Sequence, residues 1–237
     1  MEEALYLKDS YLKEFEAEVK EVKDQKFVVL DKTAFYPASG GQPHDEGLMI
    51  RESDGKEFKV VYVGKFSGQI SHEVEPEGLQ PGDRVKCKID WERRYKLMKM
   101  HTSAHILSGV IENETGALIS GNQLNLDKSR LDFSLEKYDW ERIPFWFAES
   151  NKIVDQDLSI EISFMSRTEA EKDPSLFKLV AGFPHKIDTI RIVDIVGLVK
   201  EADGGTHVKS TKEVGHLKFI EAKNKGKSNR RIYYELE

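Results

Sequence analysis

The spacing of hydrophobic residues changes near Trp91, and this change constrains the fold more than any other feature of the sequence. Before it, apolar residues alternate with charged ones, as Phe15, Ala17 and Val19 do in EFEAEVKEV. That is the period of a strand with one solvated face. From Trp91 to about Gly116 the apolar residues follow helical i, i+3, i+4 spacing. We therefore expect an α+β fold.

The change also predicts two domains, one covering residues 1–90 and the other residues 91–237. Several short strands at close spacing in the first domain indicate a small β-barrel or sandwich. Within it, ASGGQPHDEG concentrates glycine, proline and aspartate, which predicts a tight loop. The second domain mixes strands with helices. It includes a short helix capped by Ser166, with Glu169 in the capping-box position, and ends in a hairpin that turns near Gly226.

Composition limits the class of protein. Hydrophobic residues make up 39% and charged residues 33% of the 237 residues, which is typical of a globular chain. No apolar run is long enough to span a bilayer. The N-terminal MEEALYLKDS is acidic at its start and lacks an apolar h-region, so we expect no signal peptide and a cytoplasmic location.

Charge and cysteine content exclude two further classes. The net charge of −6 cannot hold nucleic acid by bulk electrostatics, so any such binding needs a local basic patch. Cys87 is the single cysteine, so an intrachain disulfide is impossible. It lies in the alternating stretch RVKCKID, which predicts a small core residue rather than a catalytic thiol.

The stretch MHTSAHIL carries the first candidate ligands. His101 and His105 are four residues apart, so they project from one face of the expected helix at the rim of its apolar stripe. Neutral imidazoles in such a place suit a metal ion, although they can also be ordinary residues at the edge of a core. Thr102 follows the first histidine where the metalloprotease helix motif needs glutamate, so that motif is absent.

A second half of the site appears in EADGGTHVKST. Asp203 and His207 are both residue types that bind zinc, and Gly204 and Gly205 allow a turn that directs them at one point. Three histidines and one aspartate would complete a tetrahedral shell, or three protein ligands would leave one position open. The alternative is an ordinary glycine loop in which His207 caps a backbone group or is solvated.

Together these motifs resemble a known family. HTSAH followed by DGGTH is similar to the paired His-x-x-x-His and Cys-x-x-x-His motifs of the alanyl-tRNA synthetase editing domain and of the free-standing alanyl-tRNA editing proteins, the AlaX family. FYPASGGQPHDEG resembles the glycine-rich element of the synthetase and of the longer AlaX forms. RRYKLMKMHTSAHIL and SRLDFSL follow in the family's order and spacing. The resemblance extends from about Leu5 to the C-terminus.

The resemblance implies a small β-barrel joined to a mixed α/β editing domain. It implies one zinc ion per chain and hydrolysis of the ester that joins a wrong amino acid to tRNA(Ala), with serine as the usual substrate and glycine in some cases. Since the chain has no room for an aminoacylation domain, it would act in trans on tRNA charged elsewhere. The family usually has cysteine where this chain has Asp203, so the aspartate is either a harder ligand or a neighbour of a three-histidine site.

Hydroxyl and glycine residues are candidates for substrate binding. An editing pocket that hydrogen-bonds the serine hydroxyl rejects alanine, because its own polar groups would then be unpaired. Thr102, Ser103 and Thr206 adjoin the ligands and are candidates for that role, although each is also a common type of backbone-bonding hydroxyl. The resemblance favours a substrate role for the short segment made of Gly40, Gly41 and Gln42, which would otherwise be a plain hairpin turn.

Basic residues occur in two groups that can contact tRNA phosphates. One precedes the histidine pair and the other lies in the last hairpin: Arg93, Arg94, Lys96 and Lys99, then Lys223, Lys225, Lys227, Arg230 and Arg231. Each is also compatible with an ordinary solvated face. Two rival functions remain at this stage, a non-catalytic tRNA-binding module of the same fold and an unrelated metal-dependent esterase.

Overall fold

The computed structural model describes residues 3–135, 140–178, 188–226 and 229–237. The chain divides into two compact units, Met1–Leu97 and Met98–Glu237, and the division falls inside the long helix α1 (Trp91–Thr115). Strands and helices are mixed as expected, so the α+β class is confirmed. The domain limits of residues 1–90 and 91–237 stay a prediction. In the described part of the chain, no helix combines the length and apolar character needed to cross a membrane.

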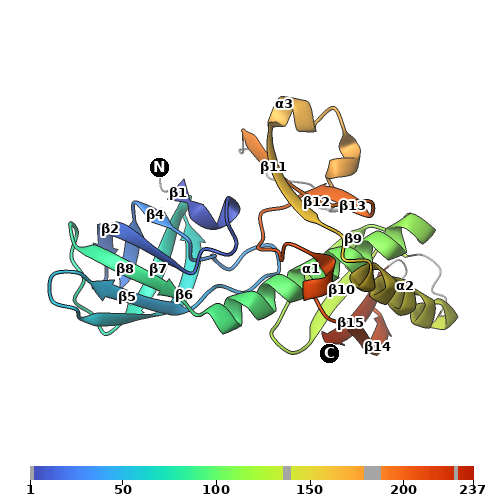
Figure 1. Cartoon of the computed structure of the whole chain (residues 1–237), viewed down its shortest axis with the longest axis horizontal. Helices are drawn as coiled ribbons and strands as arrows, with labels where there is room; N and C mark the ends of the chain where they lie inside the picture. Colours follow the sequence, from blue (N-terminus) through green and yellow to red (C-terminus); the bar gives the residue numbers. More distant parts are fainter. Residues whose placement is uncertain (1–2, 136–139, 179–187, 227–228) are drawn as a thin grey trace. The chain divides into compact units, whose positions relative to one another are not determined.

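The first unit contains a closed six-stranded barrel, drawn in blue to green in Figure 1. Alternate residues of most of its strands fill the interior, as Phe15, Ala17 and Val19 show, and Cys87 is fully buried there. The barrel confirms the strand period of the sequence. The strands of the barrel, in their order around it, are β2 (Glu14–Lys23), β3 (Phe27–Leu30), β7 (Gln69–Glu75), β6 (Glu57–Phe66), β5 (Gly47–Arg51) and β8 (Arg84–Ile89).

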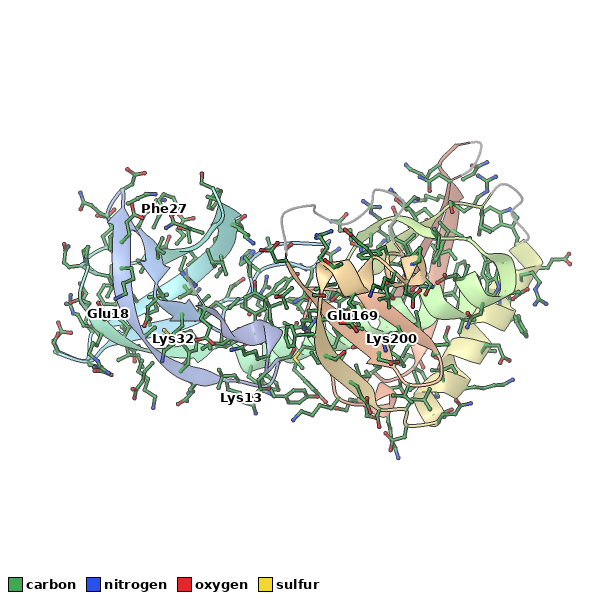
Figure 2. All side chains as sticks on the ribbon, turned by 90° about the horizontal axis from the view of Figure 1, so that it is seen from above. Lys13, Glu18, Phe27, Lys32, Glu169 and Lys200 are labelled. Atoms are coloured by element: carbon green, nitrogen blue, oxygen red, sulfur yellow. The ribbon has the colours of Figure 1, made fainter. Side chains whose placement is uncertain are left out.

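Short elements complete this unit. A parallel pair joins β1 (Glu3–Ala4) to β4 (Lys32–Thr33), and the 3-10 helix η1 (Leu5–Leu7) follows β1. Figure 2 shows charged side chains, among them Lys13 and Glu18, around the outside of the barrel. Polar exteriors and apolar interiors on the same strands are the expected result of period-two patterning.

The glycine-rich loop contains a two-residue hairpin turn. Gly40 and Gly41 both have positive φ, at 57° and 85°, which is the backbone pattern of a type I′ turn. The N–H of Ser39 donates to the carbonyl of Gln42 at 3.1 Å, and the N–H of Gln42 donates back at 2.9 Å. The tight loop predicted from the sequence is therefore present, and glycine at both central positions adopts its positive φ values without steric cost.

The second unit is built from α1, two further helices and two antiparallel sheets. One sheet has the order β14-β15-β10-β9 and the other β11-β12-β13. Ser166 caps α3 through its Oγ, which accepts from the N–H of Glu169 at 3.2 Å, as predicted. The elements are α2 (Ile143–Asp155), α3 (Arg167–Ala170), β9 (Ile119–Gln123), β10 (Ser129–Phe133), β11 (Ile160–Ser166), β12 (Thr189–Ile195), β13 (Val199–Ala202), β14 (Leu217–Asn224), β15 (Arg230–Leu236), η2 (Trp140–Arg142), η3 (Pro174–Leu176) and η4 (Thr211–Glu213).

Two contacts position α1 within the second unit. On one side, the Ser103 hydroxyl lies 3.0 Å from the hydroxyl of Tyr234, a fully buried residue of β15. On the other side, a Cβ on Gly109 would lie 3.3 Å from Leu198, just before β13. The helix and the start of β13 can approach closely because this glycine lacks a side chain. Residues of α1 thus lie beside the beginning of β13.

Candidate metal centre

The two halves of the predicted ligand set come together in the second unit. His101 and His105 project from one face of α1, and Asp203 and His207 lie in the segment after β13. One ligand atom from each of the four residues lies within 4.8 Å of the others. The three imidazole rings pack against one another, with centroids 4.5 to 5.0 Å apart. The alternative of an ordinary glycine loop with a solvated His207 does not fit this arrangement.

Each histidine turns its Nε2 atom toward the carboxylate of Asp203. The distance to Oδ2 is 3.0 Å from His207, and the distances to Oδ1 are 3.6 Å from His101 and 3.9 Å from His105. The histidine side chains are 1 to 8% exposed, whereas Asp203 keeps 20% of its side chain exposed. The cluster is therefore enclosed on the histidine side and reachable from solvent beside the carboxylate.

The loop conformation depends on a glycine and an arginine. The N–H of Gly205 donates to Oδ2 of Asp203 at 2.6 Å, and Nη1 of Arg191 donates to the Asp203 carbonyl at 2.9 Å. A Cβ at Gly205 would lie 2.0 Å from Cε1 of His101, which is an impossible contact, while a Cβ at Gly204 would meet nothing within 4 Å. The two glycines predicted together thus have different roles, and only Gly205 makes room for a ligand.

Two residues beside the ligands contact the outer nitrogens of the rings. Oε1 of Glu201 lies 2.9 Å from Nδ1 of His105, a close ion-pair approach that is not aligned for a hydrogen bond in this structure. Oγ1 of Thr102 lies 3.1 Å from Nδ1 of His207. Glu201 was not among the predicted site residues. Strand periodicity could have indicated it. Residues two positions apart on an extended segment face the same side, and Glu201 is two positions before Asp203.

The charges of the cluster follow from burial and from the two carboxylates. Burial lowers the pKa of His207 to about 4 and lowers that of His101 well below its usual value. Burial also acts on His105, but Glu201 and Asp203 outweigh it and raise its pKa to about 9. Burial alone would raise the pKa of Asp203, yet the surrounding imidazoles hold it well below the usual value. The carboxylate and two neutral imidazoles are therefore in the protonation states that a metal requires.

The donor set fits a zinc ion. Zinc takes imidazole and carboxylate ligands at about 2.0–2.2 Å, which separates neighbouring ligand atoms in a tetrahedron by roughly 3.3 Å. The observed Nε2 to carboxylate distances of 3.0 to 3.9 Å bracket that value. In the part of the chain that the structure describes, these four residues form the one group of this kind found.

The three hydroxyl residues predicted to bind substrate are fully buried beside the ligands. The Thr102 hydroxyl contacts His207 and also accepts from the N–H of Val208 at 3.3 Å. The Ser103 hydroxyl donates to the carbonyl of Met100 at 2.7 Å and contacts Tyr234. Thr206 precedes His207 in the loop and is 0% exposed.

The predicted basic residues divide by exposure. Arg94 is fully buried and binds Asp45 through its guanidinium, and Arg230 is 6% exposed with Nη1 donating to Asn224 at 2.9 Å. The exposed members are Lys96, Lys223 and Lys225. Arg93 and Arg231 keep 17% of their side chains exposed and pair with Glu46 and Asp132, Lys99 is partly exposed, and Lys227 lies outside the described residues.

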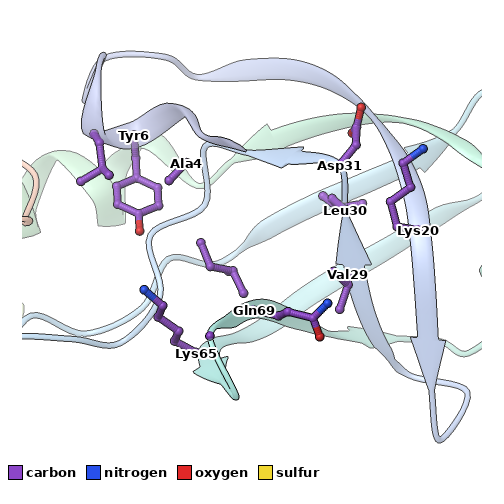
Figure 3. Close-up of a pocket in the computed structure, with 11 residues that line it drawn as sticks. Ala4, Tyr6, Lys20, Val29, Leu30, Asp31, Lys65 and Gln69 are labelled. Carbon is purple, nitrogen blue, oxygen red and sulfur yellow. The ribbon is translucent and has the colours of Figure 1, made fainter. Parts of the chain in front are cut away.

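A separate pocket lies on the barrel and is drawn in Figure 3. Lys20, Asp31, Lys65 and Gln69 line it together with apolar residues such as Val29. Its described lining includes no histidine and no cysteine, so it offers no second ligand cluster of the kind formed around Asp203.

Fold, ligand cluster and sequence comparisons agree on the class. Residues 190–233 match the family model of the threonyl and alanyl tRNA synthetase second additional domain, and residues 4–93 match that of class II (A) tRNA synthetases. The two matches fall on the barrel and on the second unit, and they place the chain among proteins related to the class II tRNA synthetases.

The relatives place the chain within that class. It is 52% identical over 243 residues to the alanyl-tRNA editing protein AlaX-M of Methanosarcina mazei, covering 100% of this chain and 97% of that protein. It is 39% identical over 239 residues to AlaX-M of Saccharolobus solfataricus, covering both chains completely. It is 38% identical to 24% of the alanine–tRNA ligase of Pyrococcus furiosus, over 91% of this chain. The chain therefore belongs to the alanyl-tRNA editing protein family, whose members are aminoacyl-tRNA deacylases.

Proposed function

We propose that the chain hydrolyses the ester of mischarged tRNA(Ala) in trans in the cytoplasm, with serine as the main misacylated residue and glycine as the second. The observation that carries this proposal is the convergence of His101, His105, Asp203 and His207 in a chain of the editing family. A synthetase pocket made for alanine separates substrates that differ by one small group by only about 1–3 kcal/mol, so a second hydrolytic site is needed.

We propose that the four residues hold one zinc ion. A zinc ion supplies positive charge that orients the substrate's amino group or activates water. The side chains around it have defined tasks. Asp203 brings a negative charge that offsets part of the metal's charge, Arg191 holds the backbone of Asp203, and the buried histidine rings keep bulk water out of one side of the site. The exposed fifth of the Asp203 side chain marks the side from which an ester can enter.

Serine selectivity needs a polar contact in the pocket. The hydroxyls of Thr102 and Ser103 already bond to protein groups, so we assign these two residues to holding the site together. Thr206, the third hydroxyl candidate, and the segment Gly40–Gln42 stay proposed substrate contacts. An alanyl ester would leave any donor that reads the serine hydroxyl unpaired, and this gives the pocket its discrimination.

For tRNA we propose the exposed cations of the last hairpin and of α1. Lys223 lies 5.1 Å above the ring of Tyr233, and Arg231 is fixed beside it by Asp132. A cationic surface around a partly exposed aromatic ring suits the backbone and bases of RNA. Lys225 belongs to the same hairpin, and Lys96 of α1 is proposed as a separate phosphate contact, whereas the buried Arg94 and Arg230 are left out.

Deacylation of matched substrates tests the proposal. Purified protein is incubated with Ser-tRNA(Ala), Gly-tRNA(Ala) and Ala-tRNA(Ala), and the remaining ester is followed over time. We expect fast loss of the seryl ester, slower loss of the glycyl ester and almost none of the alanyl ester. Cleavage of small esters without preference for tRNA would indicate an unrelated esterase. Binding of tRNA with no hydrolysis above the buffer rate would indicate a non-catalytic module.

A further inference from the structure

Two side chains outside the ligand set approach the Nδ1 atoms of two ligands. Glu201 lies at Nδ1 of His105 and Thr102 at Nδ1 of His207, at 2.9 and 3.1 Å. Both histidines turn Nε2 toward Asp203. We propose that Glu201 and Thr102 are positioning residues, which hold these two rings by Nδ1 so that each Nε2 lone pair is directed at the metal.

The role of Glu201 follows from what a carboxylate can do. An ionised carboxylate only accepts hydrogen bonds, so the nitrogen that faces it carries a proton. A neutral imidazole has one N–H, and with that proton at Nδ1 the lone pair is at Nε2. Glu201 is 9% exposed, so water competes little for the contact with His105. A carboxylate behind a metal-bound histidine fixes its tautomer and makes the ring a better ligand.

Thr102 acts on the histidine from the other segment. The N–H of Val208 donates to Oγ1 of Thr102 at 3.3 Å, and a hydroxyl oxygen can accept a second hydrogen bond. The Nδ1–H of His207 can donate this second hydrogen bond to Thr102 when Nε2 is the metal-binding atom. Thr102 lies on α1 next to His101, so the helix that carries two ligands also orients the ligand that comes from the loop.

The effect of removing each contact can be measured as a change in zinc affinity. We compare the wild type with Glu201→Ala and Thr102→Val, and with the conservative variants Glu201→Gln and Thr102→Ser, which keep an oxygen acceptor. Zinc dissociation constants are obtained by competition with a chromophoric chelator. We expect Glu201→Ala and Thr102→Val to bind zinc about 10–100-fold more weakly, and the conservative variants to recover most of the affinity.

Two control variants separate positioning from general damage. Thr115→Val removes another hydroxyl of α1, which donates to Ile111 and accepts from the N–H of Ala117. Glu112→Gln removes the charge of a partly buried glutamate that lies on α1 and pairs with Lys178. Both controls should bind zinc like the wild type. Nitrogen NMR of the zinc-loaded wild type should show protons on Nδ1 of His105 and His207, and Thr102→Val should shift the His207 proton upfield.

This assignment rests on the proposed metal site, and its failure can be told apart from failure of the proposed function. Unchanged zinc affinity in Glu201→Ala and Thr102→Val, in a wild type that binds zinc and deacylates tRNA, would overturn the positioning roles alone. Reduced affinity in these variants, in a wild type that leaves Ser-tRNA(Ala) intact, would support the positioning roles and refute the function. A wild type that binds no zinc would overturn both. If the alanine or valine variant does not fold, the NMR assignment of the Nδ1 protons decides.

Discussion

His72 in the barrel and His207 in the second unit are both buried beside a threonine, but they use opposite ring nitrogens. Nδ1 of His72 lies 2.9 Å from the carbonyl of Val28, and Nε2 lies 2.9 Å from the hydroxyl of Thr33. A carbonyl only accepts, so Nδ1 carries the proton and the Thr33 hydroxyl donates to Nε2. In His207 the threonine lies at Nδ1 instead, and Nε2 faces Asp203.

The difference separates a structural histidine from a proposed metal ligand. Both nitrogens of His72 are bonded inside the protein, to β3 of the barrel and to the neighbouring strand β4, so the ring has no lone pair to offer. His207 presents the same ring with its Nε2 among two other imidazoles and a carboxylate. Burial therefore does not identify a metal ligand, whereas the partner of each nitrogen does.

The largest expected effect distinguishes these two histidines directly. His207→Ala should abolish zinc binding and reduce Ser-tRNA(Ala) deacylation to the buffer rate, because one of four ligands is lost. His72→Ala should leave zinc binding and deacylation in place but destabilise the barrel by about 1–3 kcal/mol for each buried group left unpaired. Zinc analysis, deacylation and urea unfolding are measured on both variants. Deacylation at the wild-type rate by His207→Ala would contradict the metal site.

The two loop glycines give the next test. Gly205→Ala should remove zinc binding, because its Cβ would overlap His101, with only 2.0 Å to Cε1. Gly204→Ala is the matched control, since its Cβ would meet nothing within 4 Å. Zinc stoichiometry of both variants is the readout. Equal zinc content in the two variants would show that the His101 ring is not held against the loop as described.

Two aspartates, the buried Asp45 and the partly exposed Asp203, extend the comparison to carboxylates. Asp45 binds the fully buried Arg94, so Asp45→Asn should destabilise the protein by about 3–5 kcal/mol and leave the zinc affinity unchanged. Asp203→Asn should instead weaken zinc binding by at least about tenfold, with a smaller effect on unfolding. Chelator competition gives the zinc dissociation constant of each variant, and denaturant unfolding gives its free energy of unfolding. A reversed pattern would exchange the structural and metal-binding roles of the two residues.

The smallest expected effect is the pH dependence of the free energy of unfolding of the barrel. Burial lowers the pKa of His72 to about 4, below the value of about 6.5 in an unfolded chain. The unfolded chain therefore binds the proton first as the pH falls, and stability is lost between about pH 6.5 and 4, by up to about 3 kcal/mol. His72→Gln should flatten this part of the profile. Hydrogen exchange of barrel amides measures this stability as a function of pH. Identical profiles in the wild type and His72→Gln would refute His72 as the cause of the pH dependence.

Local sequence patterns were sufficient to predict much of the fold and to select the four candidate ligands that the structure brings together. The alternation of apolar and charged residues predicted the barrel strands, because this pattern is contained within each single strand. The spacing of His101 and His105, and that of Asp203 and His207, predicted two ligand pairs because each pair lies within one segment. Their meeting was inferred from the resemblance to a family and is observed in the structure.

Contacts between distant segments were not predictable from spacing. Thr102 and His207 are 105 positions apart, so sequence reasoning assigned Thr102 to substrate binding without seeing its partner. Arg94 was predicted to contact tRNA because it belongs to the basic group that precedes the histidine pair, whereas Asp45, 49 positions away, binds it in the interior. Both cases depend on tertiary packing, which decides whether a polar residue is exposed or bonded.

X-ray absorption at the zinc edge of the purified protein tests the central claim most directly. If His101, His105, Asp203 and His207 hold the ion, the spectrum should fit three imidazole nitrogens and one oxygen at about 2.0–2.2 Å, with no sulfur at about 2.3 Å. A zinc-free protein, a sulfur ligand or fewer than three imidazoles would contradict it.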